Sequence, residues 1–461
     1  MCNAISASDG CDGKQAHKKM SVVGGKGDGM ARGPPSSQKT QQQDLARLER
    51  VREARARPCN PAVRRYGASL RLWYDDLPLE RKQELGELES RAERAAIESG
   101  ANVPLRFRLL QLRGVSDAAR HRLLTKAEML AAMSEDNGEH FKLSSYLEAV
   151  CALPLGRRLA PALPPAEPAA GAGAYLEGVR SRLDAAVSGM DATKDAVLRI
   201  VARWIAAPAS LAGAVIGLVG PPGVGKTTIA KAFADALGLP MAFVPLGGAQ
   251  DGAHLDGHAL AYEGSMPGKV ADAVMRARCM NPVVVFDEVD KVSDTPKGRE
   301  VVGVLTHMTD PSQNAHFSDK YFSDVELDLG GCVFIFTMND EAAVSPVLLD
   351  RMALIRIDGY RRADKARIVR DHVLPGILRD HGLEGRLEMP GDALDAVLDL
   401  CPAPGVRDAR RCVDAVVGSL NLRRFRNGAD GMIEPMTRED VRRHAPRPTD
   451  DSKGIPFGMY N

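Results

Sequence analysis

The chain has 461 residues, of which 61 are Lys or Arg, 60 are Asp or Glu and 44% are hydrophobic. This is an ordinary globular composition, long enough for two or three hydrophobic cores, and it excludes collagen, coiled-coil and wholly disordered chains. The most apolar stretch, residues 211–219, is much shorter than the ~18 apolar residues that a membrane-spanning helix needs. We therefore expect a soluble protein.

The cysteine pattern favours a reducing compartment. The eight cysteines show no CxxC or zinc-type spacing, and no secretory signal peptide precedes them. A mitochondrial transit peptide is not favoured, because Asp9 and Asp12 lie early in the chain and no amphipathic arginine pattern follows. We expect reduced thiols in a cytoplasmic protein.

Charge is unevenly distributed along the chain. Residues 1–65 hold 13 Lys or Arg against six Asp or Glu, so this segment is basic and the remainder is slightly acidic. The basic segment would suit an acidic partner. It holds almost no aromatic residues for stacking on bases, which favours a solvated flexible arm instead.

The N-terminal third divides by composition. Residues 1–43 are rich in Gly, Ser, Gln and Lys, which predicts a disordered tail. Residues 44–153 show apolar side chains at a spacing of three and four, which predicts a helical region. The prolines, alanines and glycines of residues 154–174 predict a linker, because proline cannot continue a helix.

Short apolar runs alternate with helical stretches over residues 175–358, which predicts a parallel β-sheet covered by helices. The expected strands are residues 215–219, 241–244, 283–286, 333–337 and 354–357. Helical periodicity follows in residues 361–381, 391–400 and 406–425. We therefore expect an α/β core over 175–358, an all-helical domain over 359–445 and a polar tail over 446–461.

A glycine-rich loop follows the first expected strand. It consists of Gly220, Pro221, Pro222, Gly223, Val224, Gly225, Lys226 and Thr227. This is the pattern G-x-x-x-x-G-K-T between a strand and a helix expected from Thr228 to Leu237. Its backbone N–H groups would surround a β-phosphate, Lys226 would bridge the β- and γ-phosphates, and Thr227 would ligate Mg²⁺. The loop, with Thr228, predicts binding of ATP and Mg²⁺.

Two further strands end in polar side chains. Asp287 and Glu288 follow the run 283–286, and parallel strands present their C-terminal ends at the ligand-binding edge of a sheet. Asp287 would belong to the Mg²⁺ shell, and Glu288 would act as general base on the attacking water. Asn339 follows the run 333–337 and would orient that water, although an Asn after a strand is more often a turn former.

With these motifs in place, the chain resembles the ATPase module of Lon proteases, an AAA+ family. The resemblance spans about residues 115–425 and is carried by 220–227, 246–248, 266–269, 287–291, 310–314, 348–352 and 405–407. It implies an α/β P-loop NTPase (AAA+) core with a parallel sheet, followed by an all-helical lid domain and preceded by the helical region and disordered tail. It also implies hydrolysis of ATP to ADP and phosphate by a homo-hexameric ring that unfolds, remodels or translocates polypeptide.

The resemblance assigns further roles around the nucleotide. Arg351 resembles the arginine finger that reaches the neighbouring subunit's γ-phosphate, and Arg407 resembles the sensor arginine of the lid. A guanidinium neutralises charge that develops on the transferred phosphoryl group. The alternative for either residue is an arginine in a surface ion pair. Gly189 and Met190 stand at the adenine side, where Ser188 replaces the aromatic residue usual in the family.

The resemblance also assigns a substrate-gripping pore loop. Tyr262, Glu263 and Met266 occupy the positions of the first pore loop, and an aromatic residue with a methionine suits sequence-tolerant contact with polypeptide. Glu263 stands where the family usually has an aliphatic residue. The alternative is that Tyr262 packs in the core.

The chain departs from the family at both ends. Only 54 residues follow Arg407, so we expect no peptidase domain of roughly 200 residues and no peptidase activity from this chain. The β-rich N-terminal substrate domain of the family is replaced by the helical region. Three alternatives stay open: a DNA- or RNA-associated motor or loader, the ATPase half of a split protease with a separate peptidase chain, and a scaffold that binds nucleotide without cycling.

Overall fold

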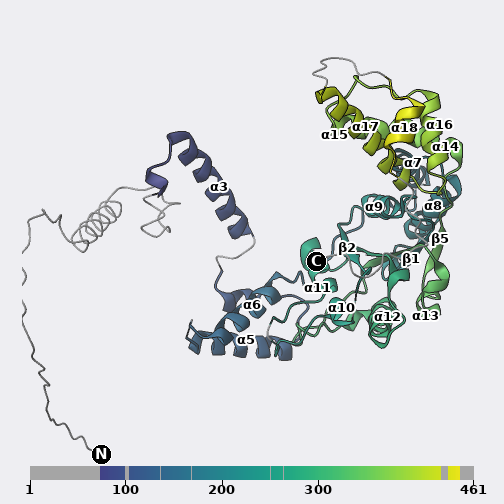
Figure 1. Ribbon diagram of the computed structural model, residues 1–461. Coiled ribbons are helices and arrows are strands. Elements are labelled where there is room, and N and C mark those ends of the chain that lie inside the picture. The colour runs from purple at the N-terminus through teal and green to yellow at the C-terminus, as the bar shows by residue number, and fades with distance from the viewer. Residues whose placement is uncertain are drawn as a thin grey trace, which may run out of the picture. The chain divides into compact units, whose positions relative to one another are not determined.

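The computed structural model describes residues 73–98, 103–134, 136–167, 169–249, 251–262, 264–426 and 435–446. The chain divides into two compact units, residues 1–102 and 103–461. In the first unit, helix α3 (Leu79–Glu98) is the long element (Figure 1). The expected tail 1–43 and residues 447–461 of the expected C-terminal tail lie outside the described residues. No helix among the described residues is long and apolar enough to span a membrane.

The second unit begins with three helices, which lie in the region expected to be helical. They are α4 (Leu105–Leu110), α5 (Asp117–Ala132) and α6 (Gly138–Ala152). Polar side chains start the two longer ones: Ser116 accepts a hydrogen bond from the N–H of Ala119 at 3.2 Å, and Asn137 accepts one from Glu139 at 3.0 Å. Their apolar faces, including Leu123 and Leu147, join the core beneath the sheet.

The proline-rich segment is shorter than expected. The described residues of 153–167 form no helix or strand, but α7 (Ala169–Ala186) begins six residues before the predicted end of the linker at 174. The prediction is wrong at that end because residues 169–174 contain only alanine and glycine after the last proline, and alanine favours helix. Val179 and Leu183 then anchor the helix in a hydrophobic core.

Five parallel strands form one sheet in the order β2-β3-β4-β1-β5. They are β1 (Val215–Val219), β2 (Met241–Pro245), β3 (Val283–Asp287), β4 (Val333–Met338) and β5 (Ala353–Arg356). Each lies within one residue of its expected position. All five C-terminal ends lie at the same edge, so the glycine-rich loop, Asp287 and Asn339 are brought together there.

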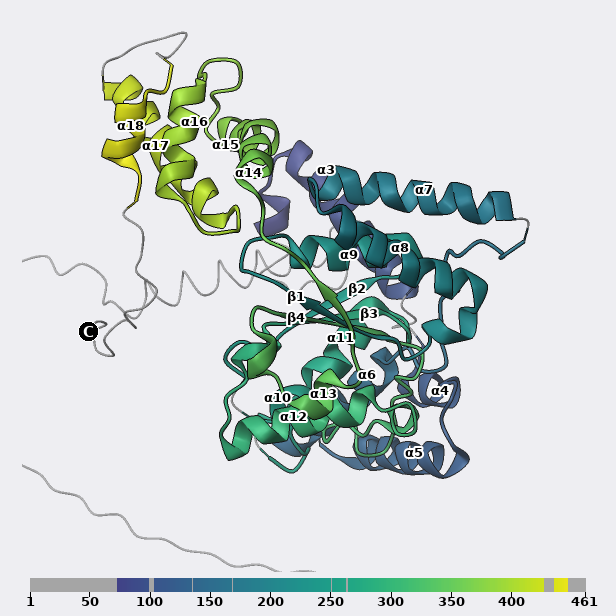
Figure 2. The same ribbon diagram turned by 90° about the vertical axis from the view of Figure 1, so that its right-hand side faces the viewer.

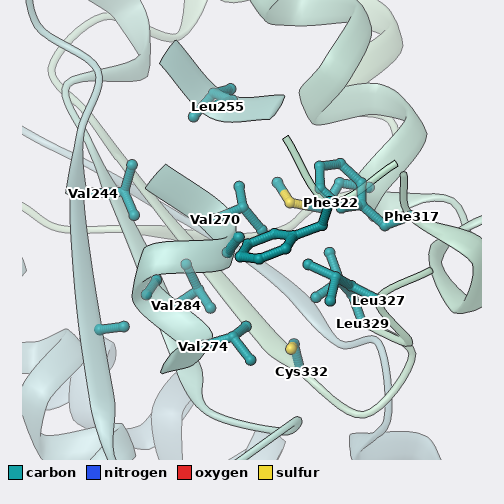
Figure 3. Close-up of a cluster of buried hydrophobic side chains, with 14 of the residues drawn as sticks. Val244, Leu255, Val270, Val274, Val284, Phe317, Phe322, Leu327, Leu329 and Cys332 are labelled. Carbon is teal, nitrogen blue, oxygen red and sulfur yellow. The ribbon is translucent and has the colours of Figure 1, made fainter. Parts of the chain in front are cut away.

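Helices cover both faces of the sheet (Figure 2). One face carries α7, α8 (Asp191–Ala206) and α9 (Lys226–Leu237); the other carries α10 (Ala253–Asp256), α11 (Lys269–Ala277), α12 (Pro296–Thr309) and α13 (Pro346–Leu349). Alternate side chains of a strand therefore enter different cores: Val285 packs with α7 to α9, and Val284 packs with α11 and α12. Figure 3 shows the second core around Phe322.

A helical domain with its own core follows the sheet. It consists of α14 (Arg362–Ile368), a π turn (Val369–Val373), α15 (Leu374–Asp380), α16 (Gly391–Leu400), α17 (Arg407–Arg426) and α18 (Arg438–His444). Thr437 and Asp440 form a capping box at α18, a helix beyond those expected from periodicity. The expected fold class, an α/β P-loop core followed by a helical lid, is confirmed.

Candidate functional site

Glycines shape the loop after β1. Gly223 has a φ of 77° and Gly225 a φ of 97°, values that glycine adopts without strain. Gly225 precedes α9, so the free N–H groups of the helix start at Lys226 are directed into the loop. At Gly220 an added Cβ would lie 2.5 Å from the carbonyl oxygen of Ile357, so a larger residue there would push β5 away. The loop has the shape required of an anion cradle.

Lys226 is held at the centre of this loop. Its Nζ donates to the carbonyl oxygens of Gly220 at 2.6 Å and Pro221 at 3.0 Å, and to Oδ1 of Asn339 at 2.7 Å. Burial lowers the pKa of the ammonium group, while Asp290 and Asp287 act in the opposite direction. The contact with Asn339 places the end of β4 directly beside the loop, as the sequence predicted.

Thr337 organises the two carboxylates at the end of β3. Its hydroxyl donates to Oδ1 of Asp287, and it accepts a hydrogen bond from the N–H of Glu288 at 3.2 Å. Glu288 adopts a left-handed backbone conformation with a φ of 60°, an uncommon state that directs its side chain away from the strand. A Cβ added on Gly247 would lie 2.5 Å from Oε2 of Glu288, so the carboxylate end packs directly against this glycine.

These groups share one cavity of about 270 Å³, which we call the phosphate cavity because Lys226 and the glycine-rich loop line it. Its lining residues are Pro222, Gly223, Gly225, Lys226, Thr227, Thr228, Asp287, Glu288, Asp290, Thr337, Met338, Asn339 and Arg407. Gly220, Pro221 and Val224 contribute through their backbones, since the first two bind Lys226 and the carbonyl of Val224 accepts a hydrogen bond from Tyr360 at 3.0 Å. The structure thus brings together most of the predicted nucleotide residues.

The donor set fits a nucleotide with a divalent cation. Asp290 lines the cavity, and neither of its buried carboxylate oxygens has a hydrogen-bond partner, although Lys291 Nζ lies 3.8 Å from Oδ2. Thr227 and Asp287 supply oxygen ligands of the type that Mg²⁺ prefers. Among the described residues no three His, Cys, Asp or Glu side chains are grouped to hold a metal by themselves. A cation here would therefore need phosphate oxygens and water to complete its shell.

The helical domain closes one side of the cavity. The N–H of Val406 donates to the carbonyl oxygen of Gly223 at 3.1 Å. An added Cβ on Gly405 would lie 2.1 Å from the carbonyl oxygen of Pro222, so the two segments touch through backbone alone. Arg407 follows as the first residue of α17 and lines the cavity, which is where a lid arginine would meet phosphate.

Arg351 lies elsewhere. Its Nη2 donates to Oδ2 of Asp310 at 3.2 Å, and the side chain lines a separate cavity of about 990 Å³ between α12 and residues 342–347. Nothing in the described part of the chain places this guanidinium in the phosphate cavity of its own subunit.

Gly189 and Met190 are not among the residues that line the phosphate cavity. Both have positive φ values, 68° and 57°, and Met190 immediately precedes α8. Val187, two residues before Gly189, lies within 3.7 Å of a Cβ added at Gly225. The assignment of the pair to the adenine side stays a prediction.

The predicted pore residues lie on an exposed loop between α10 and α11. Tyr262 is 67% exposed and Met266 is 59% exposed, so the alternative that Tyr262 packs in the core is wrong. Glu263 lies outside the described residues.

Sequence reasoning missed four residues at the site. Thr337 looked like an ordinary strand residue, and Asp290 follows the two carboxylates by only two positions. Gly247 belongs to a segment that carried the resemblance without an assigned role, and Tyr360 lies three positions after the last expected strand. A polar residue at the buried end of a strand was a usable signal for Thr337, whereas the burial of Asp290 depends on tertiary packing.

Comparison with known proteins agrees with this geometry. Residues 216–358 match the model of the ATPase family associated with various cellular activities (AAA). This chain contains a Lon-like AAA+ module. It is 35% identical to a Lon protease from Frankia alni over 343 residues, which is 72% of this chain and 38% of that protein. It is 41% identical over 188 residues to a Lon protease from Methanosarcina barkeri, covering 41% of this chain and 23% of that protein.

A Lon protease homolog from Acanthamoeba polyphaga mimivirus is 35% identical over 254 residues, 54% of this chain and 25% of that protein. The chain therefore spans between about a quarter and two fifths of the length of these relatives. The likeness covers the module that holds the phosphate cavity.

Proposed function

We propose that this Lon-like AAA+ module is a Mg²⁺-dependent ATPase that hydrolyses ATP to ADP and phosphate. The observation that carries the proposal is the joint placement of Lys226, Asp287 and Glu288 around one cavity, with Glu288 held by Thr337. A scaffold that only binds nucleotide would need the cradle and the lysine. It would not need a carboxylate that lines the cavity from a left-handed backbone position.

Under this proposal, different residues bind the phosphates, activate the water and position the carboxylates. Lys226 and the N–H groups at the start of α9 bind the phosphates, and Arg407 contacts them from the lid. Asn339 orients the attacking water, and Glu288 takes a proton from it as general base. Thr337 fixes the Asp287 carboxylate and the backbone of Glu288. When bound, Mg²⁺ would neutralise charge on the phosphate oxygens.

Arg351 would act in a neighbouring copy of the chain. In its own subunit it is paired with Asp310, outside the phosphate cavity. A guanidinium supplied by a neighbour makes hydrolysis depend on assembly, which supports a homo-oligomeric ring, with six subunits as the expected number.

The proposed substrate is polypeptide, which the motor would unfold, remodel or translocate. Tyr262 and Met266 offer exposed apolar surface for such contact. The sequence of residues 258–267 contains no Lys or Arg to meet phosphates, which disfavours the alternative of a DNA or RNA motor. We assign no peptidase activity to this chain. A separate peptidase chain as partner and a cytoplasmic location remain proposals.

The test is ATP turnover of the wild-type chain and of Glu288→Gln, each with and without casein. We expect wild-type turnover to rise with casein, and Glu288→Gln to lose about 10²- to 10⁴-fold in turnover while still binding ATP. Glu326→Gln is the matched control, because Glu326 is exposed and pairs with His316 away from the cavity. Stimulation by DNA and not by casein would instead support the nucleic-acid motor, and nucleotide binding without turnover would support the scaffold. Cleavage of casein would contradict the assignment of a motor alone.

A further inference from the structure

The exposed loop that carries Tyr262 starts and ends beside the same side chain. Gly257 follows α10 and Gly268 precedes α11, and between them the N–H of His258 donates to the carbonyl oxygen of Met266 at 3.2 Å. We call the described residues of 258–267 the Tyr262 loop. Its two ends thus lie side by side at the base.

The Asp319 carboxylate lies at this base and is fully buried. Its Oδ2 accepts a hydrogen bond from the N–H of Gly268 at 2.9 Å. Its Oδ1 accepts hydrogen bonds from the N–H groups of Tyr321 at 2.8 Å and Phe322 at 3.2 Å. A Cβ added to Gly257 would lie 2.8 Å from the same Oδ1, so the other end of the loop packs directly against the carboxylate.

The segment that carries Asp319 is anchored in the core. Phe317 and Phe322 flank it and are buried among the side chains below the sheet, together with Leu255 of α10 (Figure 3). The carboxylate therefore joins a rigid support to both ends of an exposed loop. A hydrogen bond from a fixed support to a loop base restricts the positions that the loop tip can reach.

We propose that Asp319 is the positioning residue of the Tyr262 loop, holding both ends of the loop in the arrangement that engages polypeptide. The statement that the loop engages polypeptide rests on the proposed function. The statement that Asp319 holds the loop rests only on the contacts described above.

The charge state of Asp319 gives the proposal a pH dependence. Burial raises the pKa of this carboxyl to about 6, and the nearby Asp256 adds to the increase, while the three N–H donors oppose it. Asp256 is itself paired with Lys320 at 2.9 Å, and the phenol of Tyr321 is the other titratable group that senses Asp319. Protonation converts one acceptor oxygen into a hydroxyl, so the loop base loses acceptor strength as the pH falls through about 6.

The effect of Asp319 on folding stability has the opposite sign. Because the folded-state pKa lies above the ordinary value of 3.8, the native chain binds this proton more tightly than the unfolded chain. The associated stability is fully present below about pH 4 and is lost as the pH rises through about 6. In acid we therefore expect the Tyr262 loop to loosen while the folding stability contributed by Asp319 is retained. This difference separates the effect on the loop from the effect on stability.

Hydrogen exchange of the peptide spanning residues 257–268 tests the holding role without requiring any activity. At pH 7.5 we expect Asp319→Asn to raise exchange of the Gly268 amide about tenfold relative to wild type, since asparagine offers one acceptor oxygen to three donors. Asp328→Asn is the control, because it removes an exposed carboxylate that follows the same segment and pairs with Arg158. Unchanged exchange in folded Asp319→Asn would overturn the proposal.

Turnover tests the functional part. We expect basal ATP turnover of Asp319→Asn within about twofold of wild type and casein stimulation reduced about fivefold or more, with KM for casein raised. Wild-type stimulation should fall as the pH drops through about 6, and that of Asp319→Asn should stay flat. A loosened loop with unchanged stimulation would also overturn the proposal. Absence of casein stimulation in the wild type would contradict the proposed function and leave the exchange result to decide the holding role.

A second variant keeps the test independent of misfolding. Asp256→Asn leaves all hydrogen bonds to Asp319 in place but removes the neighbouring negative charge, so the midpoint of the pH profile should move to lower pH. A purely structural role would not predict this shift. An unmoved midpoint would show that the pH response does not come from Asp319 and would contradict the proposed pH dependence of loop holding.

Discussion

At the scale of single residues, Thr337 determines how the two carboxylates of the phosphate cavity are presented. Its hydroxyl donates a hydrogen bond to Asp287 and accepts one from the N–H of Glu288, so it acts as both donor and acceptor. The side chain is buried, and no other described residue offers both contacts. The left-handed backbone of Glu288 is therefore supported by one hydroxyl.

We predict that Thr337→Val lowers ATP turnover about tenfold while ATP affinity changes little. Valine keeps the shape of threonine but loses both hydrogen bonds, which removes roughly 1–2 kcal/mol of positioning energy. Turnover under saturating ATP measures the effect. Thr309→Val is the matched control, because Thr309 is a buried threonine whose hydroxyl bonds only to helix carbonyls of α12. Equal losses in both variants would contradict a specific role for Thr337.

Sequence patterns predicted the phosphate residues well because their spacing is dictated by local geometry. A glycine-rich loop between a strand and a helix, together with polar residues at the ends of neighbouring buried strands, is typical of a phosphate-binding sheet edge. Asp290 lies in the run 287–291 that carried the resemblance, but the sequence assigned no role to Asp290 or to Asp319. Their importance arises from burial and from contacts made by distant segments, which a single sequence does not display.

At the scale of elements, Asp324 joins the helices that precede the core to the loop between α12 and β4. The buried carboxylate accepts hydrogen bonds from Lys126 of α5, from the hydroxyl of Tyr146 of α6 at 2.6 Å, and from Arg122 at 3.2 Å. Burial alone would raise the pKa of Asp324, but these donors outweigh it and hold the pKa below its ordinary value. The carboxylate of Asp324 thus links both α5 and α6 to this loop through hydrogen bonds.

We predict that Asp324→Asn lowers the free energy of unfolding by about 2–4 kcal/mol, because the buried carboxylate loses its charge-assisted hydrogen bonds to the more exposed Lys126 and Arg122. Since the folded-state pKa is lowered, the stabilisation is present above about pH 4 and is lost as the pH falls further. Denaturant unfolding at pH 7 and pH 3 measures both effects. Asp328→Asn is the control, because the exposed pair of Asp328 and Arg158 should contribute only about 0–1 kcal/mol. A variant as stable as this control would contradict the account.

The positions of the strands were predictable because all five strands are short runs rich in apolar residues. β1, β3 and β4 are buried along almost their whole length, so their positions followed from composition alone. The start of α7 was misplaced because alanine and glycine after a proline run do not indicate whether a helix begins. The tertiary anchor that decides it, the packing of Val179 and Leu183, lies about three to four turns after the start of the helix.

At the scale of the whole molecule, the separation of Arg351 from the phosphate cavity is the central observation. The phosphate cavity is lined by Glu288, Lys226 and Arg407, whereas Arg351 lines a different cavity beside Asp310. Under the proposed function, the site is therefore completed by a neighbouring copy of the chain. The chain covers less than half of the length of the Lon proteases to which it is similar.

The most direct test of this claim is ATP turnover per chain measured against chain concentration, with the state of association followed by sedimentation. We predict that turnover appears as the chains assemble, and that Arg351→Ala binds ATP and assembles but loses turnover by about 10³-fold or more. Turnover that is the same for monomers and assemblies, or that survives in Arg351→Ala, would contradict a site completed by a neighbouring subunit.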